Sequence, residues 1–286
     1  MTSPAYTLMR PDRQETPVVF SSPHSGREYP AALLGLTTLD ERAIRSSEDA
    51  FVDQLFASAP DRGAPLIAAR APRAWIDLNR AADELDPALI DGVGRAVHNP
   101  RVNSGLGVIP RVVSNGRQIY RGRIALAEAQ ARIDRLWHPY HAALRGLIDE
   151  SLTLFGQAVL IDCHSMPHEA IEAHGRPGQP RPEVVLGDRF GAAAGRDVVE
   201  AVESAFAEAG LRVARNAPFA GAYIAHAYGR PSRGQHVVQV EIDRALYMDE
   251  AQITPRADFA AFQTLMDGIV SRIAGYGRRT VPLAAE

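Results

Sequence analysis

Residues 157–163 (QAVLIDC) are the stretch that decides the fold, because they contain the clearest core strand in the chain. Gly156 precedes an apolar run of the kind found in strands that are buried on both faces. The run ends in Asp162 and Cys163, and His164 follows at once. Because ligands of open α/β sheets bind beyond the carboxyl ends of the strands, we expect His164 to lie at a functional edge.

Outward from this strand, apolar runs alternate with stretches of helical periodicity. Further strands are predicted over residues 17–22, 65–69, 74–78, 183–186, 211–214 and 236–242. Helices are predicted over residues 41–59, 126–155, 192–209 and 258–274, and Pro139 is expected to break or kink the second. Loops are predicted over residues 81–118 and 167–182, and residues 219–229 form a segment rich in glycine and aromatic residues.

This alternation favours the α/β fold class. We expect one domain over residues 1–286, with a mixed, mostly parallel sheet. A chain of 286 residues is long enough to bury a large core without covalent cross-links. Its single cysteine, Cys163, excludes an intramolecular disulfide framework and a zinc finger built from cysteines.

The charge composition excludes several classes of function. With 31 basic and 34 acidic residues, the chain lacks the basic footprint of a nucleic-acid-binding protein. No apolar run approaches the roughly 20 residues that span a bilayer, and the N-terminus lacks a signal pattern, so a cytoplasmic protein is expected. Every basic residue is arginine. Lysine chemistry is therefore excluded, and an anionic ligand must be recognised by arginine.

Polar side chains follow several of the predicted strands at the point where each strand ends. They are His24, the pair Asn79–Arg80, His164 and Glu241. Because these strand ends meet at one edge of the sheet, we expect the side chains to converge. An arginine beside an asparagine suits bidentate binding of a carboxylate. Glu241 fits a catalytic role and a salt bridge on an exposed strand face equally well.

A metal site is the main hypothesis for the two histidines. A catalytic zinc ion takes three protein ligands, and two histidines with one carboxylate are a common set. The carboxylate is open among Glu28, Glu48 and Asp49. Asp162 lies two residues before His164 on the same strand face, where it is placed to orient the imidazole.

Other candidate residues carry weaker signals. Arg73 and Arg230 are candidates for contact with an anion, although a structural role fits each of them as well. Cys163 is predicted to face the core, because adjacent strand residues point to opposite faces. No Gly-x-Ser-x-Gly elbow and no Gly-x-Gly-x-x-Gly after a strand is present, which argues against a serine nucleophile and a nucleotide cofactor.

A series of motifs spans residues 18–250 in order. They include residues 23–26 (PHSG), 48–49 (ED), 77–80 (DLNR), 105–111 (GLGVIPR), 139–141 (PYH), 162–167 (DCHSMP), 186–188 (LGD), 228–231 (YGRP) and 239–241 (QVE). In these motifs the chain resembles the N-formylglutamate amidohydrolase (deformylase) family. That family is similar in fold to the zinc carboxypeptidases. The resemblance therefore implies a three-layer α/β/α fold of the zinc-carboxypeptidase-like (phosphorylase/hydrolase-like) type.

The resemblance also implies roles for the candidate residues. It makes His24 and His164 ligands of one Zn²⁺ per chain, Asn79 and Arg80 the clamp for a substrate carboxylate, and Glu241 the general base. The chain departs from the related enzymes at Arg27, which stands where their His-x-x-Glu motif has its glutamate. Asp49 lies where the deformylases keep an aspartate and is therefore preferred as the third ligand, with Glu48 and Glu28 as alternatives.

The activity implied is hydrolysis of a small molecule, N-formyl-L-glutamate, to formate and L-glutamate, a step of histidine degradation. The second carboxylate of this substrate needs its own cation, for which Arg73 and Arg230 are the candidates. A related N-acyl-amino-acid amidohydrolase or a carboxypeptidase-like peptidase is the near alternative. The alternative from a different class is a non-catalytic protein that binds an acidic amino acid.

Overall fold

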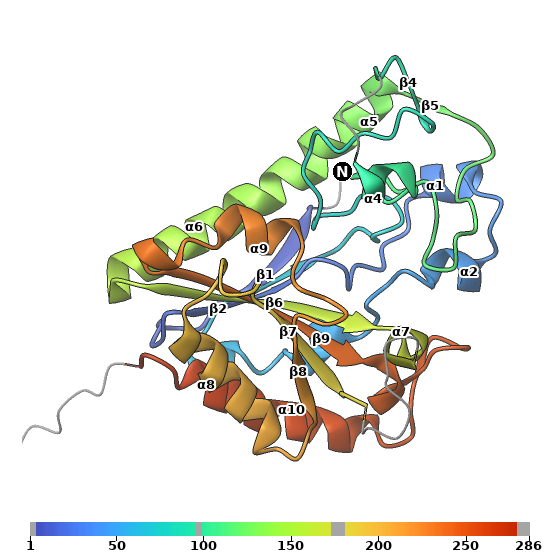
Figure 1. Ribbon diagram of the computed structural model, residues 1–286. Coiled ribbons are helices and arrows are strands. Elements are labelled where there is room, and N and C mark those ends of the chain that lie inside the picture. The colour runs from blue at the N-terminus through green and yellow to red at the C-terminus, as the bar shows by residue number, and fades with distance from the viewer. Residues whose placement is uncertain (1–3, 95–98, 173–180, 279–286) are drawn as a thin grey trace, which may run out of the picture.

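A seven-stranded sheet forms the centre of the protein in the computed structural model, which describes residues 4–94, 99–172 and 181–278 (Figure 1). Its strands are β1 (Tyr6–Met9), β2 (Val18–Ser22), β3 (Leu66–Ala69), β6 (Ala158–Met166), β7 (Val184–Gly187), β8 (Val213–Arg215) and β9 (Gln235–Asp243). Across the sheet they lie in the order β1-β3-β2-β6-β9-β7-β8. The four central strands are parallel, whereas β1 and the pair β7–β8 run the opposite way. The predicted mixed, mostly parallel α/β architecture is therefore confirmed.

Helices cover both faces of this sheet (Figure 1). The α-helices of the described chain are α1 (Ala31–Leu36), α2 (Glu41–Arg45), α3 (Val52–Leu55), α4 (Pro100–Asn103), α5 (Leu126–Arg132), α6 (His138–Phe155), α7 (His168–Glu172), α8 (Arg196–Ala207), α9 (Tyr223–Tyr228) and α10 (Phe259–Ala274). Helices α6 and α9 lie on one face of the sheet, and α8 and α10 lie on the other. The result is three layers with the sheet in the middle.

Strand β6 shows why the sheet separates two cores. All nine of its residues are buried, and they alternate between the two faces. Val159, Ile161 and Cys163 belong to the core shared with α8 and α10, whereas Ala158 and Leu160 belong to the core shared with α6 and α9. The same alternation directs Asp162 and His164 to the α6 and α9 face. Cys163 faces the core as predicted, and burial raises the pKa of its thiol well above the usual value.

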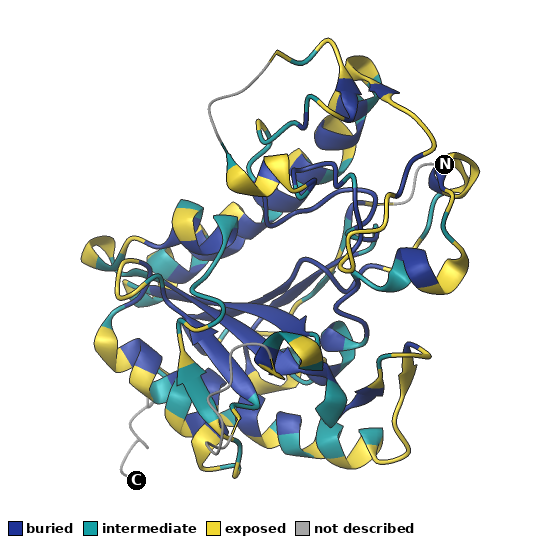
Figure 2. Cartoon of the chain, turned by 45° about the vertical axis from the view of Figure 1, so that its right-hand side comes forward, coloured by how far each residue is buried: buried dark blue, intermediate teal, exposed yellow. Residues whose placement is uncertain are grey.

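The flanking helices follow from their apolar patterns. Val198, Val199, Val202, Ala205 and Phe206 of α8 are buried, at the spacing of one helix face. The opposite side of α8 is exposed, and Figure 2 shows the same division between buried strands and outward-facing helix surfaces. The long α6 ends at Gly156, whose φ of 75° supplies the left-handed turn that stops a helix.

Two predicted elements are wrong. The helix predicted over residues 41–59 is two short helices, since α2 ends at Arg45 and α3 begins only after Phe51, whose left-handed φ of 66° a continuing helix does not allow. Residues 74–78 form turns and not a strand, and their apolar side chains (Ala74, Trp75, Ile76 and Leu78) are buried in the core beside α6. In both cases the spacing of apolar residues correctly indicates which side chains are buried. It does not distinguish a buried turn from a buried helix or strand.

The helices α5 and α6 continue into one another through a π-helical turn, Ile133–Trp137. The amide of His138 donates to the carbonyl of Ile133, five residues back, so the helix widens by one residue just before Pro139. Pro139 has no N–H to donate, and the wider turn accommodates it without ending the helix. The break or kink predicted at Pro139 is therefore a local widening of one long rod (Figure 1).

The rest of the described chain consists of short elements. Strands β4 (Ile90–Asp91) and β5 (Ile124–Ala125) pair with each other, as do β10 (Met248–Asp249) and β11 (Thr254–Pro255). Three 3₁₀ turns cover Pro60–Arg62, Pro231–Arg233 and Arg244–Leu246. The loop predicted over residues 167–182 includes α7, and its residues 173–180 lie outside the described chain, as do residues 95–98 of the loop predicted over 81–118. Within the described residues, no helix has the length and apolar character needed to cross a membrane.

Candidate active site

Two buried histidines lie side by side at the carboxyl ends of β2 and β6. His24 follows the last residue of β2 by two positions, and His164 lies near the end of β6. Because β2 and β6 are parallel neighbours, both side chains reach the same edge of the sheet. Their ring centroids are 4.7 Å apart, and the two residues are only 2% and 3% exposed. The structure thus brings together the histidines that the sequence singled out.

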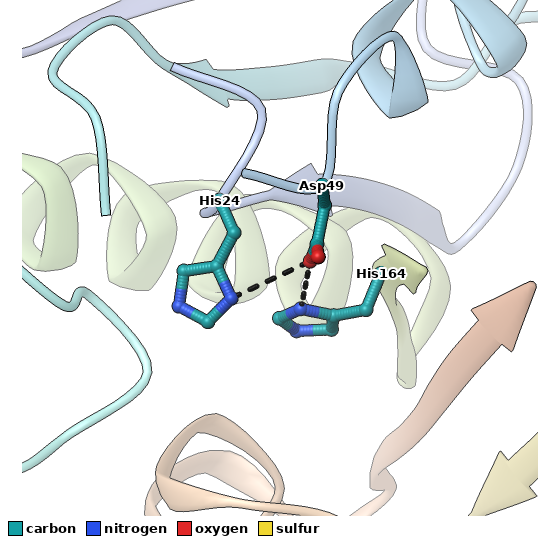
Figure 3. A group of neighbouring side chains, drawn as sticks. All are labelled: His24, Asp49 and His164. Atoms are coloured by element: carbon teal, nitrogen blue, oxygen red, sulfur yellow. Dashed lines mark hydrogen bonds and ion pairs between the residues drawn. The ribbon is translucent and has the colours of Figure 1, made fainter. Parts of the chain in front are cut away.

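Asp49 completes this group from the segment between α2 and α3. Its backbone amide donates to the carbonyl of His24 at 3.0 Å, which anchors the segment beside β2. Its Oδ2 lies 2.9 Å from Nδ1 of His164 and 3.5 Å from Nδ1 of His24 (Figure 3). Burial alone raises the pKa of Asp49, but the two histidines outweigh it and hold that pKa well below the usual value. The carboxylate is therefore ionised where it faces both rings.

The outer nitrogens of both rings are held by further carboxylates. Nε2 of His24 lies 2.7 Å from Oδ1 of Asp77, and Nε2 of His164 lies 3.1 Å from Oδ2 of Asp162. A carboxylate on the far side of an imidazole fixes the orientation of the ring and increases its basicity as a ligand. Both Nδ1 atoms therefore point at Asp49. Asp162 occupies the orienting position that its spacing from His164 indicated.

The group fits a metal ion. Nδ1 of His24 is buried and has no hydrogen-bond partner within the described chain, although buried polar atoms are normally satisfied. One ligand atom from each of His24, Asp49 and His164 lies within 4.8 Å of the others. Two imidazoles and one carboxylate directed at one point are the donor set of a catalytic zinc site. The three residues could therefore hold a divalent metal.

The two alternative carboxylates, Glu48 and Glu28, form hydrogen bonds with residues outside the histidine group. Glu48 accepts hydrogen bonds from the Tyr29 hydroxyl at 2.6 Å and from Arg45 at 3.0 Å. Glu28 accepts from Arg70 at 2.7 Å and lies at the protein surface. Neither side chain lines the cavity that contains His24 and His164. The structure therefore brings Asp49, and neither alternative, to the two histidines.

Glu241 lies beside His164 on the neighbouring strand. The register of β6 and β9 pairs His164 with Glu241, so both side chains project from the same face of the sheet. The Nε2 of Gln239 donates to Oε1 of Glu241 at 2.8 Å. Burial raises the pKa of Glu241 to about 7 against the lowering effect of His164. A carboxyl group with this pKa exchanges a proton readily near neutral pH.

Residues of the continuous helix α5–α6 hold the segment Leu78-Asn79-Arg80 at both of its ends. The indole Nε1 of Trp137 donates to the carbonyl of Arg80 at 2.9 Å, and Nε2 of His141 lies 2.9 Å from the carbonyl of Leu78. The Tyr228 hydroxyl lies 2.8 Å from Nδ1 of His141. Burial lowers the pKa of His141 to about 4, so the ring is neutral and Nε2 is its donor. The π-helical turn therefore contributes to the support of the segment that carries Asn79 and Arg80.

The side chains of Asn79 and Arg80 both line the cavity, but their hydrogen bonds differ. The Asn79 amide donates to Asp162 and contacts Nε2 of His164, each at 3.0 Å, and its oxygen accepts from the Ile224 amide at 2.7 Å. These bonds favour a positioning role for Asn79. Arg80 uses Nε on the Leu106 carbonyl and Nη1 on the Asn79 carbonyl, and within the described chain Nη2 donates to no partner.

The two other predicted arginines lie in different environments. Arg73 lines the cavity and donates from Nε to Oδ2 of Asp77 at 2.9 Å, which ties it to the partner of His24. Arg230 donates to the carbonyls of His226 and Gly229 and is absent from the residues that line the cavity. The structure thus places Arg230 away from this cavity, because the short turn that follows α9 directs its side chain to backbone carbonyls.

Arg244 is a site residue that sequence reasoning missed. It is buried at the end of β9, where Nη2 donates to Oδ1 of Asp49 at 3.0 Å and Nε donates to the Ser165 hydroxyl at 3.2 Å. Asp77, the partner of His24, lies in the motif at residues 77–80, where the sequence indicated roles for Asn79 and Arg80 alone. Position offers a signal for Arg244, since it lies two residues after the strand predicted over residues 236–242. No local signal indicates its partner Asp49, which lies 195 residues away in the chain.

The site opens into a cavity of about 390 Å³, a size typical of small-molecule sites. Its walls carry the three candidate metal ligands, Glu241 and several arginines from separate parts of the described chain, namely Arg73, Arg80, Arg101 and Arg244. A second cavity of about 380 Å³ adjoins it and shares Arg80 and Arg101. This concentration of guanidinium groups suits an anionic ligand.

Fold and site together define an α/β protein with a candidate metal centre and a titratable carboxyl group in one cavity. The model of the family described as N-formylglutamate amidohydrolase matches residues 16–248. The chain belongs to this family.

Individual proteins agree with this assignment. The chain is 29% identical over 266 residues to the N-formylglutamate deformylase of Pseudomonas putida (91% of this chain, 93% of the relative). It is 30% identical over 273 residues to the N-formylglutamate deformylase of Pseudomonas aeruginosa (93% and 96%). The crystal structure of N-formylglutamate amidohydrolase from Ralstonia eutropha JMP134 superimposes with a TM-score of 0.90 at 36% identity, covering 97% of this chain and 99% of the other. A gene product of Agrobacterium tumefaciens shares the fold, with a TM-score of 0.62 at 17% identity and coverage of 96% and 95%.

Proposed function

We propose that this protein is a zinc-dependent amidohydrolase that cleaves N-formyl-L-glutamate to formate and L-glutamate. The observation that carries the proposal is the meeting of His24, Asp49 and His164 beside Glu241 in one arginine-lined cavity. The names of the Pseudomonas relatives supply the substrate. The released L-glutamate is consistent with a step of histidine degradation.

His24 and His164 would hold one zinc ion through their Nδ1 atoms, and Asp49 would hold it through Oδ2. Zinc is the ion proposed because imidazole and carboxylate ligands in a set of three are typical of its catalytic sites. When bound, zinc supplies Lewis acidity for the activation of water and the polarisation of the scissile carbonyl group. Asp77 and Asp162 keep the two rings in the orientation that this arrangement requires.

Glu241 is the proposed general base and general acid. It accepts a proton from the attacking water and passes it to the amine nitrogen as the C–N bond breaks. Its pKa of about 7, raised by burial, favours both halves of this exchange near neutral pH. The hydrogen bond from Gln239 fixes the orientation of the carboxyl group. This titratable carboxyl group favours catalysis over the non-catalytic binding protein.

Two arginines have proposed roles in binding and stabilisation. Against the lowering effect of burial, Asp77 raises the pKa of Arg73 most, and Asp49 and Glu241 also lie close enough to raise it. Its charge is therefore placed to stabilise the oxyanion that forms at the formyl carbon. Arg80 holds the substrate α-carboxylate with its free Nη2. Asn79 keeps His164 and the start of α9 in place beside it.

The experiment is a formate-release assay on the purified protein, before and after removal of metal with a chelator. The substrates are N-formyl-L-glutamate, N-acetyl-L-glutamate and a glutamate-terminated dipeptide. We expect formate release with zinc, loss of activity on chelation, recovery on adding zinc, and little cleavage of the other two compounds. Preferred cleavage of the acetyl compound or the dipeptide would favour the related amidohydrolase or peptidase. Binding of N-formyl-L-glutamate without turnover at any metal content would favour the binding protein.

A further inference from the structure

The arginines that line the cavity differ in how many hydrogen bonds their guanidinium groups form within the protein. Nη2 of Arg244 donates to Asp49, and Nε of Arg73 donates to Asp77. Arg80 uses two of its three nitrogens on backbone carbonyls. The guanidinium of Arg101 forms no hydrogen bond or ion pair with any residue in the described ranges 4–94, 99–172 and 181–278. Arg101 is therefore the cavity arginine whose entire charged end is available to a ligand.

Arg101 is presented to the cavity by the short helix α4. The side chain of Asn99 caps this helix by accepting from the amides of Arg101 and Val102, at 3.0 and 3.3 Å. The carbonyl of Arg101 accepts from the Leu106 amide at 2.8 Å, so its backbone is anchored at both of its polar groups. The backbone from which the Arg101 side chain projects is therefore fixed at the cavity wall.

Arg101 and Arg80 are close enough for their charges to interact. Arg101 is among the charges that lower the pKa of Arg80, after burial as the main cause. Both residues line the main cavity and the adjoining one. Two neighbouring guanidinium groups repel each other when the cavity contains no anion. A ligand with two carboxylates relieves that repulsion more completely than a ligand with one.

We propose that Arg101 selects substrates with an acidic side chain by binding the side-chain carboxylate, while Arg80 binds the α-carboxylate. This inference rests on the proposed function and names the residue that sets its specificity. The sequence pointed to Arg73 or Arg230 for the second carboxylate. Arg73 is tied to Asp77 next to the metal ligands, and Arg230 lies outside the cavity. Arg101 is the cavity arginine that remains for this carboxylate.

The test compares N-formyl-L-glutamate with N-formyl-L-glutamine, which has nearly the same shape and lacks the side-chain charge. The protein is assayed as the zinc-loaded full chain, and the measured quantity is the ratio of kcat/KM for the two substrates. In Arg101→Gln we expect this ratio to fall about 10- to 100-fold, the loss typical of one charge-assisted hydrogen-bond contact. The value for N-formyl-L-glutamine should change little, since that substrate offers Arg101 no carboxylate.

Arg189→Gln is the matched control. Arg189 lines the adjoining cavity and is absent from the walls of the main one. We expect the substrate ratio of this variant to equal that of the wild type. An equal fall of the ratio in both variants would assign the preference to the general positive field and overturn the proposal. An unchanged ratio in Arg101→Gln, including the case in which kcat/KM falls equally for both substrates, would also overturn it.

A binding measurement separates this proposal from the proposed function. Titration calorimetry with L-glutamate and L-glutamine reports the preference for a side-chain carboxylate without any turnover. If the wild type hydrolyses neither formyl compound, the proposed function fails. The role of Arg101 is then decided by whether Arg101→Gln removes the preference for L-glutamate. Retention of that preference in the variant would exclude Arg101 as its source.

Discussion

Arg244 binds the oxygen of Asp49 that faces away from the two histidines. Its Nη2 lies 3.0 Å from Oδ1, while Oδ2 of the same carboxylate lies 2.9 Å from Nδ1 of His164. Arg244 is itself held by the Ser165 hydroxyl and the Ser46 carbonyl. The planar guanidinium therefore fixes the plane and the direction of the carboxylate. This relationship makes Arg244 a positioning residue for the candidate metal centre.

Replacement of Arg244 should weaken metal binding more than it weakens the fold. For Arg244→Met we expect the zinc dissociation constant to rise about 10- to 100-fold, as is usual when the partner of a metal ligand is removed. Competition with a chromophoric chelator measures this constant. Arg196→Met, which removes an exposed arginine paired with Glu200, is the control and should leave it unchanged. A zinc affinity equal to that of the wild type in Arg244→Met would show that Asp49 does not depend on this contact.

Replacement of Glu241 should separate metal binding from turnover. In Glu241→Gln the amide replaces the carboxyl group beside Gln239 without a change of size, but it accepts no proton. We expect zinc content to equal that of the wild type and kcat to fall about 10²- to 10⁴-fold. Metal analysis and formate release on the same preparation provide both values. The surface change Glu208→Gln is the control, and a fully active Glu241→Gln protein would remove Glu241 from the mechanism.

Replacement of Trp137 should loosen the segment that carries Arg80. Trp137→Phe removes the indole donor to the Arg80 carbonyl and keeps most of the aromatic packing against His141. We expect a loss of about 1–3 kcal/mol in the free energy of unfolding, because a buried carbonyl loses its partner. KM for N-formyl-L-glutamate should rise while kcat changes less, since the role proposed for Arg80 is to bind the substrate carboxylate, away from the reacting bond. A fall in kcat with unchanged KM would contradict this assignment.

His141 should make the stability depend on pH. The fold holds this residue neutral with a pKa lowered by burial from 6.5 to about 4, so the unfolded chain binds more protons between these values. Its contribution is complete above pH 6.5 and is lost as the pH falls towards 4. Between about pH 7 and pH 5 this residue should remove about 2 kcal/mol from the free energy of unfolding.

The variant His141→Gln isolates that contribution. Glutamine keeps a donor for the Leu78 carbonyl and an acceptor for the Tyr228 hydroxyl, and it does not titrate. Urea unfolding of wild type and variant at both pH values gives the two differences in free energy. The wild type should lose about 2 kcal/mol more than the variant. Equal losses in the two proteins would show that His141 titrates alike in the folded and unfolded states.

Much of the layered fold could be predicted from local patterns. The apolar run that became β6 and the alternating run that became β9 specify buried strands, because only a pleated strand places their side chains in two cores. The periodic apolar stripe of α8 specifies a helix for the corresponding reason. The turns at residues 74–78 and the break at Phe51 depend on packing against distant elements, so no local pattern distinguished them from a strand and a helix.

The candidate site divides in the same way. The sequence by itself determined the strand-end positions of His24, His164 and Glu241, because the carboxyl ends of parallel strands meet at one edge. Residue spacing left the carboxylate open, the family resemblance preferred Asp49, and the tertiary structure shows that Asp49, and not Glu48, faces the histidines. The presence of Arg244 and Arg101 in the cavity was likewise seen only in the folded structure. The physical reason is that side-chain contacts between residues far apart in the chain depend on loop paths set by burial and hydrogen bonding of the whole molecule. The spacing of residues in the sequence therefore does not predict those contacts.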